Sequence, residues 1–252
     1  MNHGRSDPAY VDAVVLAAGK GTRMKSELAK VLHPLAGKPL LSHVLASLRE
    51  TGIERTIVVV GHQAERVRAI CSGPQLECVL QEPQLGTGHA VQMAAPHLRP
   101  EGFCVVLNGD VPLLRPRTIQ KLIQECRQQA VAAAVLTCVV PDAGAYGRIL
   151  KDCEGRLQQI VEARDATPEQ LAIGEFNTGV YCFRTADLRF ALQKLTDDND
   201  QREYYLTDTI VHLVAAGRPV VAVVGEDPDE VVGINTGQEL AAAERLYLSR
   251  QA

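Results

Sequence analysis

A glycine-rich loop with basic side chains follows the first apolar segment of the chain, in the stretch VVLAAGKGTRMKSELAK from Val14 to Lys30. Residues 19–38 contain five lysines and arginines and one acid, although the whole chain has a formal net charge of −4. Backbone amides of a glycine loop can converge on phosphate oxygens, Arg23 can add planar charge-assisted hydrogen bonds, and Lys30 can add a mobile positive charge. Together these residues predict a polyphosphate site. Any one of them alone is equally explained by a tight turn with solvated side chains.

A second polar signature, LNGDVPLL, follows another apolar segment and contains Asn108, Gly109 and Asp110. A carboxylate just past a buried strand is held firmly, and Mg²⁺ prefers oxygen ligands beside substrate phosphates. Asn235, which lies ahead of a capped helix, could supply a second oxygen. Asparagine and aspartate are also common turn residues, so a metal site depends on both side chains meeting in the fold.

Familiar catalytic motifs are absent from the sequence. GKGTRM has Met24 where the dinucleotide fingerprint needs its last glycine, and the Gly-Lys pair at 37–38 is followed by Pro39, which excludes a P-loop. The sequence contains neither H-E-x-x-H nor G-x-S-x-G, so a zinc protease or a serine hydrolase has no support. The seven cysteines form no C-x-x-C pair, which favours reduced, buried thiols in a cytosolic protein over a catalytic cysteine.

Strand-like and helix-like segments alternate along the first half of the chain and must position these groups. This βαβα order predicts an α/β fold with a Rossmann-like, mostly parallel sheet and helices on both faces, whose ligands bind beyond the carboxyl ends of the strands. After residue 140 two short strands around a turn at 152–155, and another strand in EFNTGVYCF, predict a small added β-rich lobe. The other predicted strands are 11–17, 56–60, 77–80, 103–107, 132–140 and 220–224, and the predicted helices are 40–48, 64–70, 89–95, 117–128, 186–195, 207–216 and, after a Thr236/Glu239 capping box, 237–248.

Charge and hydropathy limit the partners. The chain is mildly acidic and has no basic face beyond the loop, so we expect no nucleic acid partner. The longest apolar runs, such as 131–140, are too short to span a bilayer, and the N-terminal MNHGRSDPAY has no apolar core of a signal peptide. These features predict a cytoplasmic protein with no membrane partner.

The opening motif, L-A-A-G-x-G-T-R-M with Lys30 downstream, resembles the sugar-phosphate nucleotidyltransferase superfamily. Seven further motifs narrow the resemblance: AKVLHPLAGKPLL, QLGTGHAV, NGDVPLL, YGRIL, EFNTGVY, EYYLTD and GINT are similar, in this order, to the N-acetylglucosamine-1-phosphate uridyltransferase domain of the bacterial GlmU family. The resemblance extends from about Val11 to the C-terminal helix. It implies a nucleotide-diphospho-sugar transferase fold over residues 1–252, with a nucleotide-binding part at about 11–140, a sugar-binding lobe at about 141–236 and a C-terminal helix at 237–249.

For the nucleotide, the resemblance implies three groups of residues. The loop would hold UTP with Ala17 and Gly19 near the uridine, while Arg23 and Lys30 neutralise the triphosphate. Gln81 and the Gly-Thr pair at 86–87 would read the uracil edges. Family members often have tyrosine where Asn108 stands, so this position keeps a hydrogen-bonding group but loses an aromatic contact. The implied nucleotide-side residues are Leu16, Ala17, Ala18, Gly19, Arg23, Lys30, Gln81, Gly86, Thr87, Asn108 and Gly109, and the implied Mg²⁺ ligands are Asp110 and Asn235.

For the sugar, the resemblance implies a pocket in the added lobe. Glu162 and Asn177 lie in or at the end of predicted strands there, opposite the nucleotide loop. The implied sugar-binding residues are Gly147, Glu162, Asn177, Tyr205 and Thr207.

The resemblance further implies a reaction in which UTP and N-acetylglucosamine 1-phosphate give pyrophosphate and UDP-N-acetylglucosamine, a peptidoglycan precursor. Arg23, Lys30 and Asp110 would be catalytic. Two alternatives stay open: a related nucleotidyltransferase that uses another sugar 1-phosphate or another nucleotide, and a non-catalytic nucleotide-sugar sensor, which the presence of all three residues disfavours. GlmU proteins continue into a β-helix acetyltransferase. The 252 residues contain no hexapeptide repeat, so we expect no β-helix domain and no acetyl transfer from them.

Overall fold

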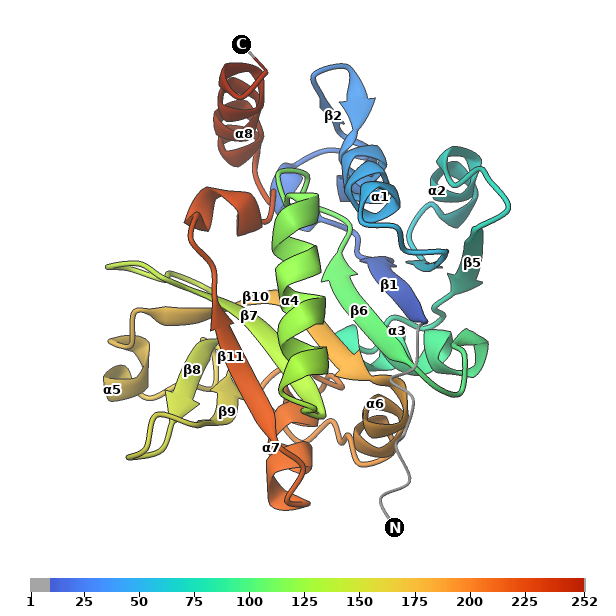
Figure 1. The fold of residues 1–252 in the computed structure, drawn as a ribbon. Helices are drawn as coiled ribbons and strands as arrows, with labels where there is room; N and C mark the ends of the chain where they lie inside the picture. The colour runs from blue at the N-terminus through green and yellow to red at the C-terminus, as the bar shows by residue number, and fades with distance from the viewer. Residues whose placement is uncertain (1–9, 252) are drawn as a thin grey trace.

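The main sheet has nine strands in the described part of the chain, and its principal path runs in the order β11-β7-β10-β6-β1-β4-β5 (Figure 1). The computed structural model describes residues 10–251. β1 (Val11–Ala17) lies between β4 (Arg55–Val60) and β6 (Phe103–Asn108) and is parallel to both, and β5 (Leu76–Leu80) extends this parallel half as the edge strand. The predicted α/β sheet is therefore confirmed.

The strands β1, β4 and β6 are largely apolar runs because both of their faces are buried. In β1, Ala13, Val15 and Ala17 face one core, whereas Val14 faces the other. The β-branched side chains of Val14 and Val15 pack well on a pleated surface, which favours an extended segment.

Helices cover both faces of the sheet, as the sequence predicts (Figure 1). One core contains side chains of α1 (Leu40–Glu50), α2 (Ala64–Ile70) and α4 (Pro116–Gln128). The opposite core contains side chains of α3 (Thr87–Ala94), α6 (Thr185–Leu192) and α7 (Asp208–Ala215). In α4 the buried side chains recur at helical spacing, so its apolar stripe faces the sheet; they are Ile119, Leu122, Ile123 and Cys126.

A third, smaller apolar cluster packs the C-terminal helix α8 (Gly237–Ser249) against a hairpin formed by β2 (Pro34–Leu35) and β3 (Lys38–Pro39). It contains Leu35, Leu40, Ile234 and Ala243 among its buried side chains. The predicted capping box at the start of α8 is confirmed, with both reciprocal hydrogen bonds present. The cap fixes the end of the loop that carries Asn235.

The strand predicted in EFNTGVYCF is not confined to the small lobe. It forms β10 (Glu175–Arg184), which is inserted between β6 and β7 (Ala133–Val139) of the main sheet and is antiparallel to both. Its buried residues Cys182 and Phe183 contact the two cores, one on each face, so its burial suits an interior strand. Only β8 (Arg148–Lys151) and β9 (Leu157–Val161) branch off the principal path, and they join it through the Phe176–Arg148 pair.

Within residues 10–251 no helix is long and apolar enough to cross a membrane. The prediction that MNHGRSDPAY is not a signal peptide concerns residues 1–10, of which 1–9 are outside the described part. The further elements are β11 (Val220–Val224), α5 (Pro168–Leu171) and the 3₁₀ turns Thr22–Met24, Lys30–Leu32, Ala95–His97 and Pro228–Val231.

Candidate active site

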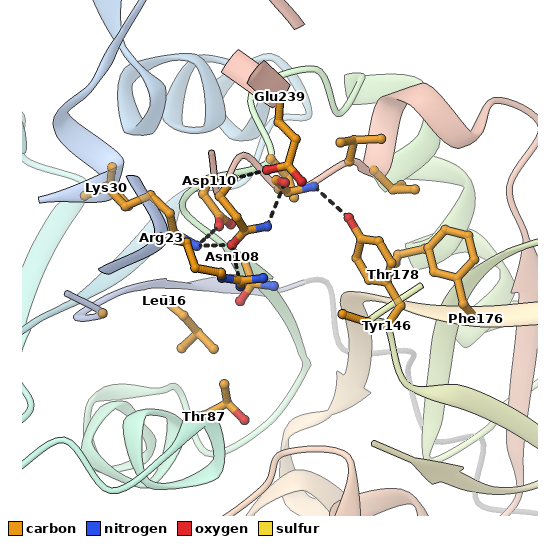
Figure 2. Close-up of a pocket in the computed structure, with 18 of the residues that line it drawn as sticks. Leu16, Arg23, Lys30, Thr87, Asn108, Asp110, Tyr146, Phe176, Thr178 and Glu239 are labelled. Carbon is orange, nitrogen blue, oxygen red and sulfur yellow. Dashed lines mark hydrogen bonds and ion pairs between the residues drawn. The ribbon is translucent and has the colours of Figure 1, made fainter. Parts of the chain in front are cut away.

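A cleft of about 770 Å³ opens at the carboxyl ends of β1 and β6, where the two polar signatures of the sequence meet. The backbone amide of Gly109 donates to the carbonyl oxygen of Leu16 at 2.9 Å, so the segments after the two strands are joined directly. Figure 2 shows Arg23, Lys30 and Asp110 gathered on one side of this cleft, with Tyr146 and Phe176 on another. The parallel sheet thus places the residues where α/β folds bind ligands.

Four side chains form a charged cluster: Arg23, Lys30, Asp110 and Asn235. The Lys30 ammonium forms an ion pair with Asp110 Oδ2 and donates to Asn235 Oδ1 at 2.9 Å. Arg23 Nη2 donates to the same Asn235 oxygen, also at 2.9 Å. The Lys30 and Asp110 side chains are only 18% and 10% exposed, so their charges are less screened than those of a surface pair. Two cationic groups and one carboxylate therefore converge on a single point of the cleft.

Only Arg23 and Lys30 of the five basic residues in the 19–38 segment line the cleft. The other three are exposed, so the solvated-turn explanation fits them; they are Lys20, Lys25 and Lys38.

Backbone geometry positions Lys30. Gly21 has φ +66°, and a Cβ atom at this position would lie 2.5 Å from the Cβ atom of Lys30, so only glycine lets the two segments approach. Gln63, at the start of α2, donates to the carbonyl oxygen of Glu27 at 2.6 Å and accepts from the amide of Ala29 at 3.2 Å. The segment that leads to Lys30 is thereby fixed to the helical layer.

Asn235 is held by the cap of α8. The Glu239 carboxylate accepts from the backbone amides of Asn235 at 2.6 Å and Thr236 at 2.8 Å. The Asn235 amide group donates to the carbonyl oxygen of Gly233 at 2.9 Å, which turns its Oδ1 toward the two cations. Sequence reasoning found the capping box but missed that Glu239 also lines the cleft.

The start of α3 forms another part of the cleft wall. Gln81 is buried and donates from Nε2 to the carbonyl oxygen of Gly86 at 2.9 Å. Gly86 has φ +106°, and a Cβ atom there would lie 2.6 Å from the carbonyl oxygen of Tyr204. Thr87 Oγ1 accepts from the amide of Leu206 at 3.1 Å. The predicted uracil-reading residues therefore lie together, and they are tied to the segment that leads into α7.

The predicted sugar residues form a second cluster that borders the cleft without lining it. Thr207 Oγ1 donates to Glu162 Oε1 at 3.0 Å. The backbone amide of Asn177 donates to the carbonyl oxygen of Gly147 at 2.8 Å. Burial raises the pKa of Glu162, which the hydrogen bond from Thr207 partly opposes. Asn177 Nδ2 also donates to the buried Tyr181 hydroxyl at 2.7 Å.

The second cluster reaches the cleft next to Asn108. A Cβ atom at Gly179 would lie 2.5 Å from Asn108 Nδ2, and the Gly179 amide donates to Asn177 Oδ1 at 3.1 Å. Asn108 therefore lies between the glycine-rich loop and the predicted sugar cluster. Tyr205 is buried, and its hydroxyl accepts a hydrogen bond from Gln201 at 2.7 Å.

Two aromatic side chains that sequence reasoning missed, Tyr146 and Phe176, line the cleft next to the segment that carries Asn235. The rings of Tyr146 and Phe176 lie 4.7 Å apart, and the Tyr146 hydroxyl accepts from the amide of Gly233 at 3.1 Å. Burial raises the pKa of Tyr146. The motif YGRIL contains Tyr146, but the resemblance implies a binding role only for its neighbour Gly147.

The structure brings most of the predicted residues to one cleft. Those lining it are Leu16, Ala17, Ala18, Gly19, Arg23, Lys30, Gln81, Gly86, Thr87, Asn108, Asp110 and Asn235. Those outside its lining are Gly109, Gly147, Glu162, Asn177, Tyr205 and Thr207. Further lining residues without a predicted role include Gln84, Tyr146, Phe176, Thr178, Glu203 and Glu239.

The donor set of the charged cluster suits a hard divalent cation. Asp110 Oδ2 and Asn235 Oδ1 already surround one positive group, the Lys30 ammonium. Among the described residues no three His, Cys, Asp or Glu side chains form a group that could hold a metal ion, so a closed protein cage is absent there. Mg²⁺ in such sites is coordinated by one or two protein oxygens, while waters and substrate phosphates provide its other ligands.

Residues 13–211 match the MobA-like NTP transferase domain family, and the chain belongs to this family. A solved UDP-glucose pyrophosphorylase complexed with UDP-glucose shares the fold, with a TM-score of 0.77 over 96% of this chain and 99% of that chain at 17% identity.

The curated relatives are more specific than the family model, and they confirm the resemblance to GlmU proteins seen in the motifs. The bifunctional protein GlmU of Cellvibrio japonicus is 47% identical over 245 residues, which are 96% of this chain and 53% of the relative. The bifunctional protein GlmU of Geobacillus thermodenitrificans is 47% identical over 239 residues, which are 94% of this chain and 52% of the relative. The chain thus spans about half the length of the curated relatives it matches.

Proposed function

We propose that the chain transfers a uridylyl group from UTP to N-acetylglucosamine 1-phosphate, forming UDP-N-acetylglucosamine and pyrophosphate. The observation that carries the proposal is the charged cluster, in which Lys30, Arg23, Asp110 and Asn235 meet beside the glycine loop in one cleft. The similarity to GlmU proteins over nearly the whole chain supports uridine and N-acetylglucosamine as the specific groups.

The nucleotide lies along the loop from Leu16 to Gly19, with its base toward Gln81 and the start of α3. Gln81 donates through Nε2 to Gly86, so its side chain is held in one orientation and can read a base edge. Lys30 and Arg23 then face the triphosphate, since both project into the cleft from the segment that follows the loop. Their positive charges offset the concentrated negative charge of the phosphates.

The sugar lies toward the second cluster, in contact with Glu162, Asn177 and Thr207. Glu162 accepts from Thr207 with Oε1, which leaves its other oxygen for a sugar hydroxyl. Because these residues border the cleft beside Asn108, a sugar held by them directs its 1-phosphate toward the charged cluster.

Asp110 and Asn235 hold Mg²⁺ in this proposal, and when bound it supplies charge stabilisation at the α-phosphate and the departing pyrophosphate. Lys30 keeps its contact with the cluster and shifts its ammonium toward the phosphates. The sugar phosphate is already ionised at neutral pH, so no side chain has to remove a proton from it. One of its oxygens attacks the α-phosphorus in line, and pyrophosphate leaves from the opposite side.

The chain's own residues therefore work by positioning and by electrostatics. Alignment of the two phosphates converts a bimolecular encounter into a reaction within one complex. Fixed cations stabilise the charge that develops on the transferring group. No nucleophilic side chain has a role, so no covalent enzyme intermediate forms.

A pyrophosphate-release assay with each of four nucleoside triphosphates and a panel of sugar 1-phosphates tests the proposal. We expect release with UTP and N-acetylglucosamine 1-phosphate in the presence of Mg²⁺, and much less with every other pair. Greatest release with glucose 1-phosphate or another nucleotide would reassign the specificity. Tight binding of UDP-N-acetylglucosamine without any turnover would instead support a nucleotide-sugar sensor.

A further inference from the structure

Tyr146 lines the cleft, and the proposed reaction gives it no role. Its hydroxyl accepts a hydrogen bond from the backbone amide of Gly233 at 3.1 Å, across 87 positions of the sequence (Figure 2). Burial raises the pKa of Tyr146, so the hydroxyl stays protonated at neutral pH and acts as a neutral acceptor rather than as a base. The hydroxyl therefore joins the loop between β7 and β8 to the segment that carries Asn235.

Gly233 connects this contact to Asn235. Its carbonyl oxygen accepts from Asn235 Nδ2 at 2.9 Å, which directs Asn235 Oδ1 toward the charged cluster. A Cβ atom at Gly233 would lie 3.7 Å from Asp110 Oδ2, and the next amide, of Ile234, donates to the carbonyl oxygen of Asp110 at 2.9 Å. The orientation of the peptide groups of Gly233 thus determines where the Asn235 oxygen lies relative to Asp110.

A buried arginine holds the loop that carries Tyr146. Arg148 is only 2% exposed, and its guanidinium donates to the carbonyl oxygens of Gly144 at 2.9 Å and Leu171 at 3.3 Å. It also donates to the carbonyl oxygen of Tyr146 itself. A buried charge is costly unless hydrogen bonds compensate it. The compensation here comes from backbone carbonyl groups, so it depends on the conformation of residues 144–146.

The position of Arg148 in the sheet adds a second restraint on Tyr146. Arg148 pairs with Phe176 at the point where β8 joins β10. The rings of Phe176 and Tyr146 lie 4.7 Å apart. Tyr146 is therefore held through its backbone by Arg148 and through its ring by Phe176, and the small lobe is connected in this way to the charged cluster.

We propose that Tyr146 is a positioning residue whose hydroxyl, acting through Gly233, holds Asn235 Oδ1 in the charged cluster, and that Arg148 fixes Tyr146 for this role. The consequence for catalysis rests on the proposed function, in which Asp110 and Asn235 hold Mg²⁺. Removal of the hydroxyl takes away the acceptor of the Gly233 amide, so the Asn235 oxygen is placed less firmly and the affinity for Mg²⁺ falls.

The Mg²⁺ dependence of pyrophosphate release tests the role of the hydroxyl. Tyr146→Phe keeps the ring that packs on Phe176 and removes only the hydroxyl. With UTP and N-acetylglucosamine 1-phosphate, we expect the Mg²⁺ concentration for half-maximal rate to rise by about tenfold. A smaller folded fraction would lower the rate at every Mg²⁺ concentration without moving this midpoint. Tyr10→Phe removes a hydroxyl just before β1, at the end of that strand away from the cleft, and is the matched control with an unchanged midpoint.

Arg148→Lys tests the residue that fixes Tyr146. Lysine keeps the charge but has a single nitrogen, so it cannot donate to the three carbonyl oxygens in the same geometry. We expect a higher Mg²⁺ midpoint, and a shift in the double variant with Tyr146→Phe that is smaller than the product of the two single shifts, because both changes act on one contact. A shift equal to that product would contradict the role of Arg148. Tyr146→Phe decides the role of the hydroxyl by itself if Arg148→Lys does not fold.

Amide hydrogen exchange of the ligand-free protein tests the contact without any measurement of activity. In Tyr146→Phe the peptide covering residues 231–236 should exchange faster than in the parent, whereas the peptide of β9 should exchange at the same rate. Unchanged exchange in residues 231–236, or an unchanged Mg²⁺ midpoint in Tyr146→Phe, would overturn the proposal. A parent protein that releases no pyrophosphate would refute the proposed function instead, and the exchange comparison would still decide whether Tyr146 positions the Asn235 segment.

Discussion

Asp110 is the carboxylate of the charged cluster, and its replacement by asparagine removes one negative charge while keeping the size of the side chain. An oxygen acceptor for the Lys30 ammonium remains, so the local packing should survive. The lost charge weakens the hold on a divalent cation and leaves the cation of Lys30 beside only neutral oxygens. We expect kcat to fall by about 10²–10³-fold, which corresponds to about 2.7–4 kcal/mol of transition-state stabilisation.

The effect of Asp110→Asn on stability should be much smaller than its effect on catalysis. The Lys30–Asp110 pair is partly exposed, and the amide oxygen can still accept, so the free energy of unfolding should change by about 1 kcal/mol or less. The assay is pyrophosphate release at saturating substrates across a Mg²⁺ titration, with circular dichroism and urea unfolding of the same samples. Asp152→Asn, in the turn between β8 and β9, is the matched control and should keep full activity. An unchanged kcat for Asp110→Asn at every Mg²⁺ concentration, with a native spectrum, would refute a role for this carboxylate.

Three further predictions concern the residues around the cluster. Lys30→Ala and Arg23→Ala should each lower kcat/KM by about tenfold or more in the pyrophosphate assay, whereas side chains of a solvated turn would change it little. Gly21→Ala should lower kcat by about tenfold or more, because its Cβ atom would displace Lys30. Gly37 also has a positive φ, +78° against +66° at Gly21, but a Cβ atom there would meet open space, so equal kcat losses in Gly37→Ala and Gly21→Ala would contradict this reason. Burial raises the pKa of Glu162, so ionising this carboxyl lowers the stability of the folded protein as the pH rises above 4.5, the ordinary pKa of glutamate. The free energy of unfolding of Glu162→Gln, measured in urea, should therefore increase relative to that of the parent between about pH 4 and pH 7. The same difference in unfolding free energy at both pH values would be evidence against a buried charge.

The parallel half of the fold and the glycine-rich turn after β1 could be predicted because their signals are local. β1 is an apolar run that ends in a glycine-rich turn, and the spacing of buried residues in α4 matches one helical face. The capping box between Thr236 and Glu239 predicted the start of α8, since its residues are three positions apart. In each of these cases the sequence pattern and the physical contact fall within one element.

The rest depends on contacts between distant segments. β10 is antiparallel in a largely parallel sheet, and neither its direction nor its place between β6 and β7 follows from its hydrophobicity. Gln63 contacts Glu27, and Tyr146 contacts Gly233, across long stretches of sequence with no local pattern.

The most direct test of the central claim is the stoichiometry of the products. The parent protein is incubated with UTP, N-acetylglucosamine 1-phosphate and Mg²⁺, and UDP-N-acetylglucosamine and pyrophosphate are quantified by chromatography in the same samples. We expect the two products to accumulate in equal amounts, and both rates to fall together in Lys30→Ala. Pyrophosphate without the nucleotide sugar, or a nucleotide sugar formed equally well by Lys30→Ala, would contradict uridylyl transfer at the charged cluster.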